Sequence, residues 1–109
     1  MLLAIDIGNS MVTLGAFEGE RLVTTLRVAT DTRRLADEYG LLITNLLNLN
    51  GIEPARITAI SLCSVVPPLT LGFEEVCNTY FGLKPLTVSA GVRTGLRITY
   101  DNPKNVGSD

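Results

Sequence analysis

Five consecutive residues near the start of the chain, Asp6-Ile7-Gly8-Asn9-Ser10, combine chemical groups that can hold a phosphate. The glycine lets a phosphate approach the backbone, turn amides donate hydrogen bonds, and the Asp6 carboxylate can hold Mg²⁺ directly or through water. Gly and Asn are also common in ordinary hairpin turns, so the spacing alone leaves both interpretations open. The position of Asp6 after an aliphatic run favours the phosphate site, because a buried carboxylate is costly unless a cation or hydrogen-bond donors accompany it.

A second group of polar residues lies at the end of the sequence and is suited to a hydroxyl substrate. Asp109 could act there as a general base, and Tyr100 could form a hydrogen-bonding wall. Taken alone, Asp101-Asn102-Pro103 is more typical of a turn, and Asp109 is as well placed to cap or open a following helix.

Two further stretches are interpreted mainly as structural. The stretch from Ser61 to Pro68 is a strand end followed by two prolines, although its small residues could admit a ligand. Arg93 and Arg97 could contact an anion, but exposed arginines are usually only solvated.

The composition excludes several classes of partner and site. Nine basic and eleven acidic residues give a net charge of -2 without a long run of either sign, so no nucleic acid and no membrane is expected as a partner. No uncharged apolar stretch approaches the ~20 residues that span a bilayer, and Asp6 interrupts the start too early for a secretory signal, which predicts a cytoplasmic protein. The chain has no histidine, which excludes imidazole catalysis within it, and Cys63 and Cys77 are expected to be buried thiols.

The hydrophobic pattern indicates the elements that must position these residues. Leu2 to Ile7 and Met11 to Phe17 predict two strands joined by a turn at residues 8–10, and Leu22 to Val28 predicts a third antiparallel strand. The candidate phosphate site therefore lies on the first hairpin.

Two helices are predicted from apolar residues that recur three and four positions apart. The first runs from Leu35 to Leu47, with Thr30-Asp31-Thr32 as candidate caps and Asn50-Gly51 as its stop. Gly40 inside this helix is expected to allow close packing on the sheet. The second helix runs from Leu69 to Phe81 and is followed by a glycine.

The remaining strands complete a recognisable order. Ile57 to Val66 predicts a buried central strand that Pro67-Pro68 ends, Pro85 to Ser89 predicts a short strand, and a brief strand is expected at Leu96 to Tyr100. The order βββ-α-β-α-β with a mixed sheet is typical of the ribonuclease-H-like and actin-like ATPase domains, an α/β fold that binds phosphates across its first hairpin. A dinucleotide-binding fold would begin βαβ, and the sequence has no Walker-type Gly-Lys-Ser or Gly-Lys-Thr.

Read together, these motifs resemble those of the type III pantothenate kinases, a family of actin-fold kinases. The resemblance covers the whole chain, and its first motif is shared with many actin-fold enzymes, whereas its last is far more specific. The matching stretches are Asp6-Ile7-Gly8-Asn9-Ser10, Ala36-Asp37-Glu38, Ser64-Val65-Val66-Pro67-Pro68-Leu69-Thr70, Thr94-Gly95-Leu96, and Tyr100-Asp101-Asn102-Pro103 with Val106-Gly107-Ser108-Asp109.

The resemblance implies an activity and its cofactors. A kinase of this family phosphorylates pantothenate to 4′-phosphopantothenate with ATP, the first step of coenzyme A biosynthesis, and uses Mg²⁺ and a monovalent cation (K⁺ or NH₄⁺). The resemblance also implies a homodimer.

The resemblance further implies roles for individual residues. The segment that would contact the ATP phosphates is Asp6, Ile7, Gly8, Asn9, Ser10, Met11, Val12 and Thr13, with Asp6 as the metal-binding residue. Tyr100, Gly107, Ser108 and Asp109 would line the pantothenate site, with Asp109 as the proton acceptor. Phosphoryl transfer depends chiefly on positioning and charge neutralisation, which fits these roles.

Two departures from the family pattern bear on these roles. Met11 and Val12 stand where the family usually carries small polar residues, which removes side-chain donors near the nucleotide. Family members are more than twice as long, so we expect residues 1–109 to be the N-terminal domain of a two-domain kinase and to be inactive alone. The alternative is a non-catalytic actin-fold module that binds nucleotide weakly or only pairs with another subunit.

Overall fold

The computed structural model describes residues 1–88, which form two helices, a short 3₁₀ helix and five strands. The predicted strand at 96–100 and the predicted site residues Tyr100, Gly107, Ser108 and Asp109 lie outside the described residues. In chain order the elements are β1 (Leu2–Ile7), β2 (Met11–Glu18), β3 (Arg21–Ala29), α1 (Ala36–Leu49), η1 (Pro54–Arg56), β4 (Ala59–Ser64), α2 (Pro67–Phe81) and β5 (Leu86–Val88).

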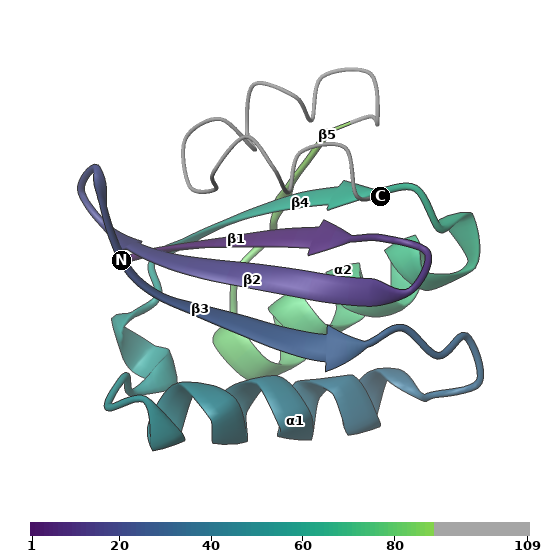
Figure 1. Ribbon diagram of the computed structural model, residues 1–109, viewed down its shortest axis with the longest axis horizontal. Coiled ribbons are helices and arrows are strands. Elements are labelled where there is room, and N and C mark those ends of the chain that lie inside the picture. The colour runs from purple at the N-terminus through teal and green to yellow at the C-terminus, as the bar shows by residue number, and fades with distance from the viewer. Residues whose placement is uncertain (89–109) are drawn as a thin grey trace.

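The strands form one mixed sheet in the order β3-β2-β1-β4-β5 (Figure 1). β2 is antiparallel to both of its neighbours, whereas β1 pairs in parallel with β4, and β4 pairs in parallel with β5. The predicted order βββ-α-β-α-β is therefore confirmed. β1, β3, β4 and β5 all run in one direction, so their carboxyl ends share one edge of the sheet, which we call the carboxyl edge. The turn between β1 and β2 lies at this edge as well.

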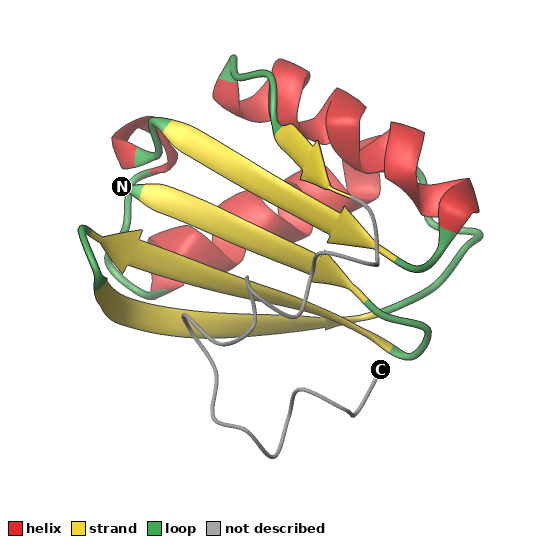
Figure 2. Ribbon diagram, turned by 90° about the horizontal axis from the view of Figure 1, so that it is seen from above, coloured by secondary structure: helices red, strands yellow, loops and turns green. Residues whose placement is uncertain are grey.

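Both helices cover the same face of the sheet (Figure 2). Side chains alternate along each strand, and on β1 the three residues Leu3, Ile5 and Ile7 point into the core that the helices complete. Tyr39 and Ile43 of α1 are among the helical residues buried in this core. The other face of the sheet carries no helix among residues 1–88, and for that reason alone we call it the open face, since Asp6 and Cys63 on it are buried.

A row of five residues crosses the open face, one from each strand. The register pairs Asp6 with Thr13 and with Cys63, Thr13 with Arg27, and Cys63 with Val88. Directly paired residues point to the same side of a sheet, so all five side chains share the open face. This row lies one residue before the end of β1.

The start of the first helix differs from the prediction. α1 begins at Ala36 with Leu35 before it, so Thr30-Asp31-Thr32 are not its caps. Leu35 has no side-chain oxygen, and its backbone N–H donates a hydrogen bond to Oε1 of Glu38 at 2.7 Å. The predicted caps instead belong to the connection between β3 and α1.

The second helix begins earlier than predicted. Pro67 and Pro68 do more than end the strand, because they occupy the first positions of α2. Proline is favourable there, since its missing N–H would have no partner within the helix. At the other end Gly82 adopts a left-handed backbone with φ of 64°, which supports its predicted role as the stop.

Gly40 permits a contact between helices, and the expected packing on the sheet was wrong. A Cβ atom at this position would overlap the ring of Tyr80 on α2. The Tyr80 hydroxyl also donates a hydrogen bond to Oδ1 of Asp37 at 3.0 Å. The absence of a side chain at Gly40 therefore lets α1 and α2 approach closely.

Cys63 and Cys77 are both buried, as predicted. Burial, and secondarily the nearby Glu74 carboxylate, raises the pKa of the Cys77 thiol to about 12. Cys77 therefore stays neutral at physiological pH and acts as a small apolar residue of the core.

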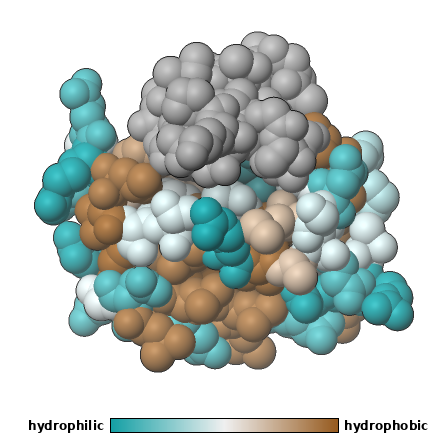
Figure 3. Space-filling model, viewed as in Figure 1, coloured by the Kyte–Doolittle hydropathy of each residue, from teal (hydrophilic) through white to brown (hydrophobic). Residues whose placement is uncertain are grey.

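The outer surface of α1 is also partly apolar. Leu35, Leu41, Leu42 and Leu49 are exposed, and Figure 3 shows hydrophobic residues gathered over the part of this view that α1 and β3 occupy. The apolar surface of α1 thus extends beyond the side that the sheet covers. Among residues 1–88, neither helix is long and apolar enough to cross a bilayer.

Candidate functional site

The turn Gly8–Ser10 joins β1 to β2 at the carboxyl edge and presents backbone amides to solvent. The Gly8 N–H donates a hydrogen bond to the Met11 carbonyl at 2.9 Å, which closes the turn. Asn9 and Ser10 are exposed, and within residues 1–88 their N–H groups make no hydrogen bond to the protein. Exposed amides of a turn can receive an anion, so the turn has the donors that the sequence predicted for a phosphate.

Asp6 lies beside this turn on the open face. Its side chain is only 3% exposed, while the neighbouring Ile5 and Ile7 face the helices. One strand spacing separates Asp6 from Thr13 on one side and from Cys63 on the other. The structure therefore places a buried carboxylate two residues before the turn amides, on the face of the sheet that the helices leave uncovered.

Five of the eight residues predicted to contact ATP lie on strands, and they face opposite sides of the sheet. Ile7 and Val12 are fully buried in the helix-covered core, so their side chains cannot contact a ligand on the open face. Met11, which is 39% exposed, and the half-buried Thr13 lie on the other side of β2. The concern that an apolar residue removes a side-chain donor therefore applies to Met11 and not to Val12.

Thr30 contacts the turn from the end of β3, a contact that sequence reasoning missed. Its hydroxyl Oγ1 donates a hydrogen bond to the Gly8 carbonyl at 2.8 Å, and its N–H donates to the Ser10 carbonyl at 3.1 Å. Thr30 and Gly8 lie 22 positions apart in sequence. The available signal was a threonine directly after a strand next to the hairpin, but it was interpreted as a helix cap.

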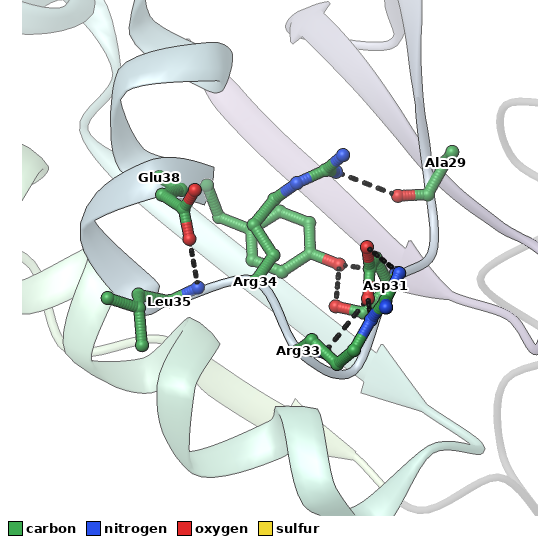
Figure 4. A network of polar contacts seen from close by, with 7 residues as sticks. Ala29, Asp31, Arg33, Arg34, Leu35 and Glu38 are labelled. Atoms are coloured by element: carbon green, nitrogen blue, oxygen red, sulfur yellow. Dashed lines mark hydrogen bonds and ion pairs between the residues drawn. The ribbon is translucent and has the colours of Figure 1, made fainter.

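The residues after Thr30 are fixed by a polar network (Figure 4). The Tyr39 hydroxyl accepts a hydrogen bond from the Asp31 N–H at 2.9 Å and donates one to the Asp31 carbonyl at 3.0 Å. The Arg34 guanidinium lies 5.1 Å from the centre of the Tyr39 ring and donates to the Ala29 carbonyl at 3.0 Å. This loop is therefore tied both to the core and to the end of β3.

The same loop contains a local ion pair. The Arg33 side chain and backbone N–H both donate to the Asp31 carboxylate, at 3.2 and 2.9 Å to Oδ1. These hydrogen bonds lower the pKa of Asp31 below its usual value. Asp31 is thus ionised at physiological pH.

The connection between β4 and α2 lies beside the end of β1. The Val65 N–H donates to the Ile7 carbonyl at 3.1 Å, and the Ser64 hydroxyl oxygen accepts a hydrogen bond from the Val66 N–H at 3.0 Å. The Ser64 side chain is therefore used within its own turn. This agrees with the structural role predicted for the stretch from Ser61 to Pro68.

The described residues offer one carboxylate on the open face where a nucleotide-bound Mg²⁺ could be held. Within residues 1–88 no group of three or more acidic or cysteine side chains is arranged to hold a metal ion. Mg²⁺ at nucleotide sites usually relies on one or two carboxylates together with the substrate phosphates. The single buried carboxylate of Asp6 fits that pattern.

Comparison with known proteins gives the family. The sequence model of type III pantothenate kinase matches residues 2–109. The chain belongs to the type III pantothenate kinase family. A type III pantothenate kinase of Myxococcus xanthus is 50% identical over 109 residues, which are 100% of this chain and 43% of the relative. One from Geobacter sulfurreducens has the same identity and coverage. The chain thus spans 43% of the length of these two pantothenate kinases.

A solved structure gives the fold. The ROK hexokinase of Thermus thermophilus superposes with a TM-score of 0.66 and 16% sequence identity, covering 87% of this chain and 37% of the hexokinase. At this identity the likeness concerns the fold alone. Together with the mixed five-stranded sheet, it confirms the predicted actin-like, ribonuclease-H-like architecture for this pantothenate kinase family member.

Proposed function

We propose that residues 1–109 are the N-terminal domain of a two-domain kinase that phosphorylates pantothenate with ATP, the first step of coenzyme A biosynthesis. The observation that carries this proposal is the family match across residues 2–109. The relatives' additional length supports the second domain, since this chain spans 43% of them. The enzyme would act in the cytoplasm as a homodimer.

The Gly8–Ser10 turn would bind the phosphates of ATP. The exposed Asn9 and Ser10 amides would donate hydrogen bonds to phosphate oxygens. Gly8 is buried, so in place of the direct approach expected at this residue it would support the turn through its own N–H and carbonyl. Met11 and Thr13 would border the nucleotide on the open face, whereas Ile7 and Val12 would support the turn from the core. Donors fixed before the ligand arrives need no reorganisation during the reaction.

Asp6 would hold the Mg²⁺ that accompanies ATP, directly or through a water molecule. The bound ion would neutralise charge on the β- and γ-phosphates. The monovalent cation, K⁺ or NH₄⁺, would bind outside residues 1–109.

The acceptor side of the site would come from the end of the chain. Tyr100, Gly107 and Ser108 would line the pantothenate pocket, and the Asp109 carboxylate would take the hydroxyl proton. The hydroxyl oxygen would then form a bond to the γ-phosphorus as the bond from that phosphorus to the bridging oxygen breaks, releasing ADP.

A coupled assay of ADP release by the full-length protein tests the function. We expect ADP release with Mg·ATP that requires pantothenate and is not supported by glucose in its place. The Asp109→Asn variant should lose most of kcat, and wild-type kcat in this variant would reject the assigned base. Residues 1–109 alone should be inactive, and turnover by them would contradict the two-domain account.

The non-catalytic alternative makes a different prediction in calorimetry. A module that only pairs with another subunit should give no heat of binding with Mg·ATP or with pantothenate, whereas the kinase should bind both. The apolar residues Met11 and Val12 favour this alternative, but Val12 does so less than its sequence position suggested, because its side chain lies in the core.

Light scattering of the full-length protein tests the proposed homodimer.

A further inference from the structure

We propose that Thr30 is a positioning residue for the ATP phosphates, acting through the Gly8–Ser10 turn. This inference rests on the proposed function, because it concerns the same turn. Thr30 reaches the turn with both of its hydrogen-bond donors, the side-chain hydroxyl to Gly8 and the backbone N–H to Ser10. No other residue among 1–88 contributes a side-chain hydrogen bond to the backbone of this turn.

The two hydrogen bonds fix the directions of two peptide groups. In a planar trans peptide the carbonyl and the following N–H point in opposite directions. Holding the Gly8 carbonyl toward Thr30 therefore turns the Asn9 N–H away from Thr30. Holding the Ser10 carbonyl does the same to the Met11 N–H. Of the two amides assigned to the phosphate, Thr30 therefore orients the Asn9 N–H before any phosphate is bound.

Thr30 is itself held firmly enough to do this. It follows the last residue of β3, is half-buried, and is succeeded by Asp31, whose backbone the Tyr39 hydroxyl holds at both its N–H and its carbonyl. Tyr39 is buried in the core at 1% exposure. The turn is therefore connected to the core through Thr30, so its amide directions do not depend on the turn sequence alone.

Two threonines provide a matched test, Thr30 directly after β3 and Thr24 within it. Thr30→Val in the full-length protein removes the hydroxyl while keeping the shape, and Thr30→Ser keeps the hydroxyl. Thr24→Val is the control, because the Thr24 hydroxyl donates to Oδ1 of Asn50 at 3.2 Å, far from the turn. For each variant we would measure kcat, the KM for ATP, the KM for pantothenate, the Kd for Mg·ATP by calorimetry, and the Tm.

Thr30→Val should raise the KM and the Kd for ATP about tenfold, as expected for the loss of one well-placed hydrogen bond. The KM for pantothenate should change less than about twofold, and Thr30→Ser should restore most of the ATP affinity. Thr24→Val should leave both KM values unchanged. Binding would be measured well below the Tm of each variant, so that a loss of stability is not counted as a loss of affinity.

Other outcomes overturn the inference in distinguishable ways. An unchanged ATP affinity in Thr30→Val, equal changes in both KM values, or a serine variant as weak as the valine variant would each reject Thr30 as a positioning residue. If the wild-type protein binds Mg·ATP but transfers no phosphate to pantothenate, the proposed function fails, and the Kd comparison still decides the role of Thr30. If the wild-type protein binds no Mg·ATP, both proposals fail.

Discussion

The two edges of the sheet are held together by different kinds of contact. At the edge opposite the candidate site, the N-terminal ammonium of Met1 lies 4.0 Å from the Glu18 carboxylate, and the Arg56 guanidinium lies 3.4 Å from the same carboxylate. The Met1 ammonium also donates to the Arg56 carbonyl at 2.9 Å. Two cations and one carboxylate, from three separate parts of the chain, therefore meet at that edge.

At the carboxyl edge, hydrogen bonds and not ion pairs join the elements. Thr30 connects β3 to the Gly8–Ser10 turn, and the Val65 N–H connects the β4–α2 loop to the end of β1. The ion pair of Asp31 and Arg33 joins residues two positions apart within one loop, so it does not connect elements. A polyanion such as ATP would compete for the cations of a structural ion pair, whereas it leaves neutral hydrogen bonds largely undisturbed. This difference suits the carboxyl edge to a charged ligand.

The largest expected effect tests the charge at the carboxyl edge. Asp6→Asn keeps the shape of the buried side chain but removes the charge that would hold Mg²⁺, so kcat/KM for ATP should fall about 100-fold or more in the full-length enzyme. Glu18→Gln removes a carboxylate from the opposite edge and should leave kcat/KM unchanged. If both substitutions lowered kcat/KM for ATP equally, the carboxyl edge would have no special role in ATP binding.

The next largest effect is expected on stability, from the hydrogen bonds by which Tyr39 holds the backbone of Asp31 next to Thr30. Tyr39→Phe leaves the Asp31 N–H and carbonyl without their shared partner in a half-buried position, and this should cost about 1–3 kcal/mol of unfolding free energy. Tyr80→Phe is the control, because its hydroxyl bonds to Asp37 at the surface and should matter less. Scanning calorimetry would measure both, and a larger loss in Tyr80→Phe would contradict the role assigned to Tyr39.

The contact between Gly40 on α1 and Tyr80 on α2 lies at neither edge of the sheet, and we expect its disruption to have an effect of intermediate size on stability. Gly40→Ala gains about 1 kcal/mol of helix propensity, but its methyl group would overlap the Tyr80 ring. The ring would have to shift and give up its hydrogen bond to Asp37, so we expect a small net loss of stability. In a Tyr80→Ala background the same substitution should instead stabilise the protein. A loss in both backgrounds would show that Tyr80 is not the cause.

The smallest effect is expected at the opposite edge and should depend on salt. Glu18 and Arg56 are each about half exposed, at 51% and 49%, so Glu18→Gln should cost only about 0.2–1 kcal/mol. Raising the salt from about 0.05 M to about 0.5 M should remove most of that difference, because screening weakens exposed ion pairs. Chemical denaturation with urea at the two salt concentrations would measure it. A cost that does not change with salt would mean that the contacts at this edge are not mainly ionic.

Local sequence predicted the elements well, and what it missed came from contacts between distant residues. The strand ending at Ile7, the turn at residues 8–10 and the stop at Gly82 follow from hydrophobic runs and backbone preferences that neighbouring residues determine. The contact of Thr30 with Gly8 depends on the register between β2 and β3, which local pattern does not encode. Gly40 meeting Tyr80 depends in the same way on how two helices cross.

The candidate site shows the same division. Sequence located the Asp6 to Ser10 motif, and the structure adds that Asp6 faces the open side of the sheet while Val12 faces the core. Alternation along the strand would have predicted the orientation of Val12 once the register of the hairpin was known. The roles of Tyr100 and Asp109 remain predictions from the family resemblance, because both lie outside the described residues.

The two prolines that open α2 decide which amides at this edge remain for an anion. The first four backbone positions of a helix normally offer donors that attract phosphate. Here the Val66 N–H is bound to Ser64, Pro67 and Pro68 have no N–H at all, and the Leu69 N–H is bound to the Val66 carbonyl. α2 therefore has no vacant donor at its beginning, so an anion near the end of β4 could be bound by the exposed amides of the Gly8–Ser10 turn but not by the start of this helix.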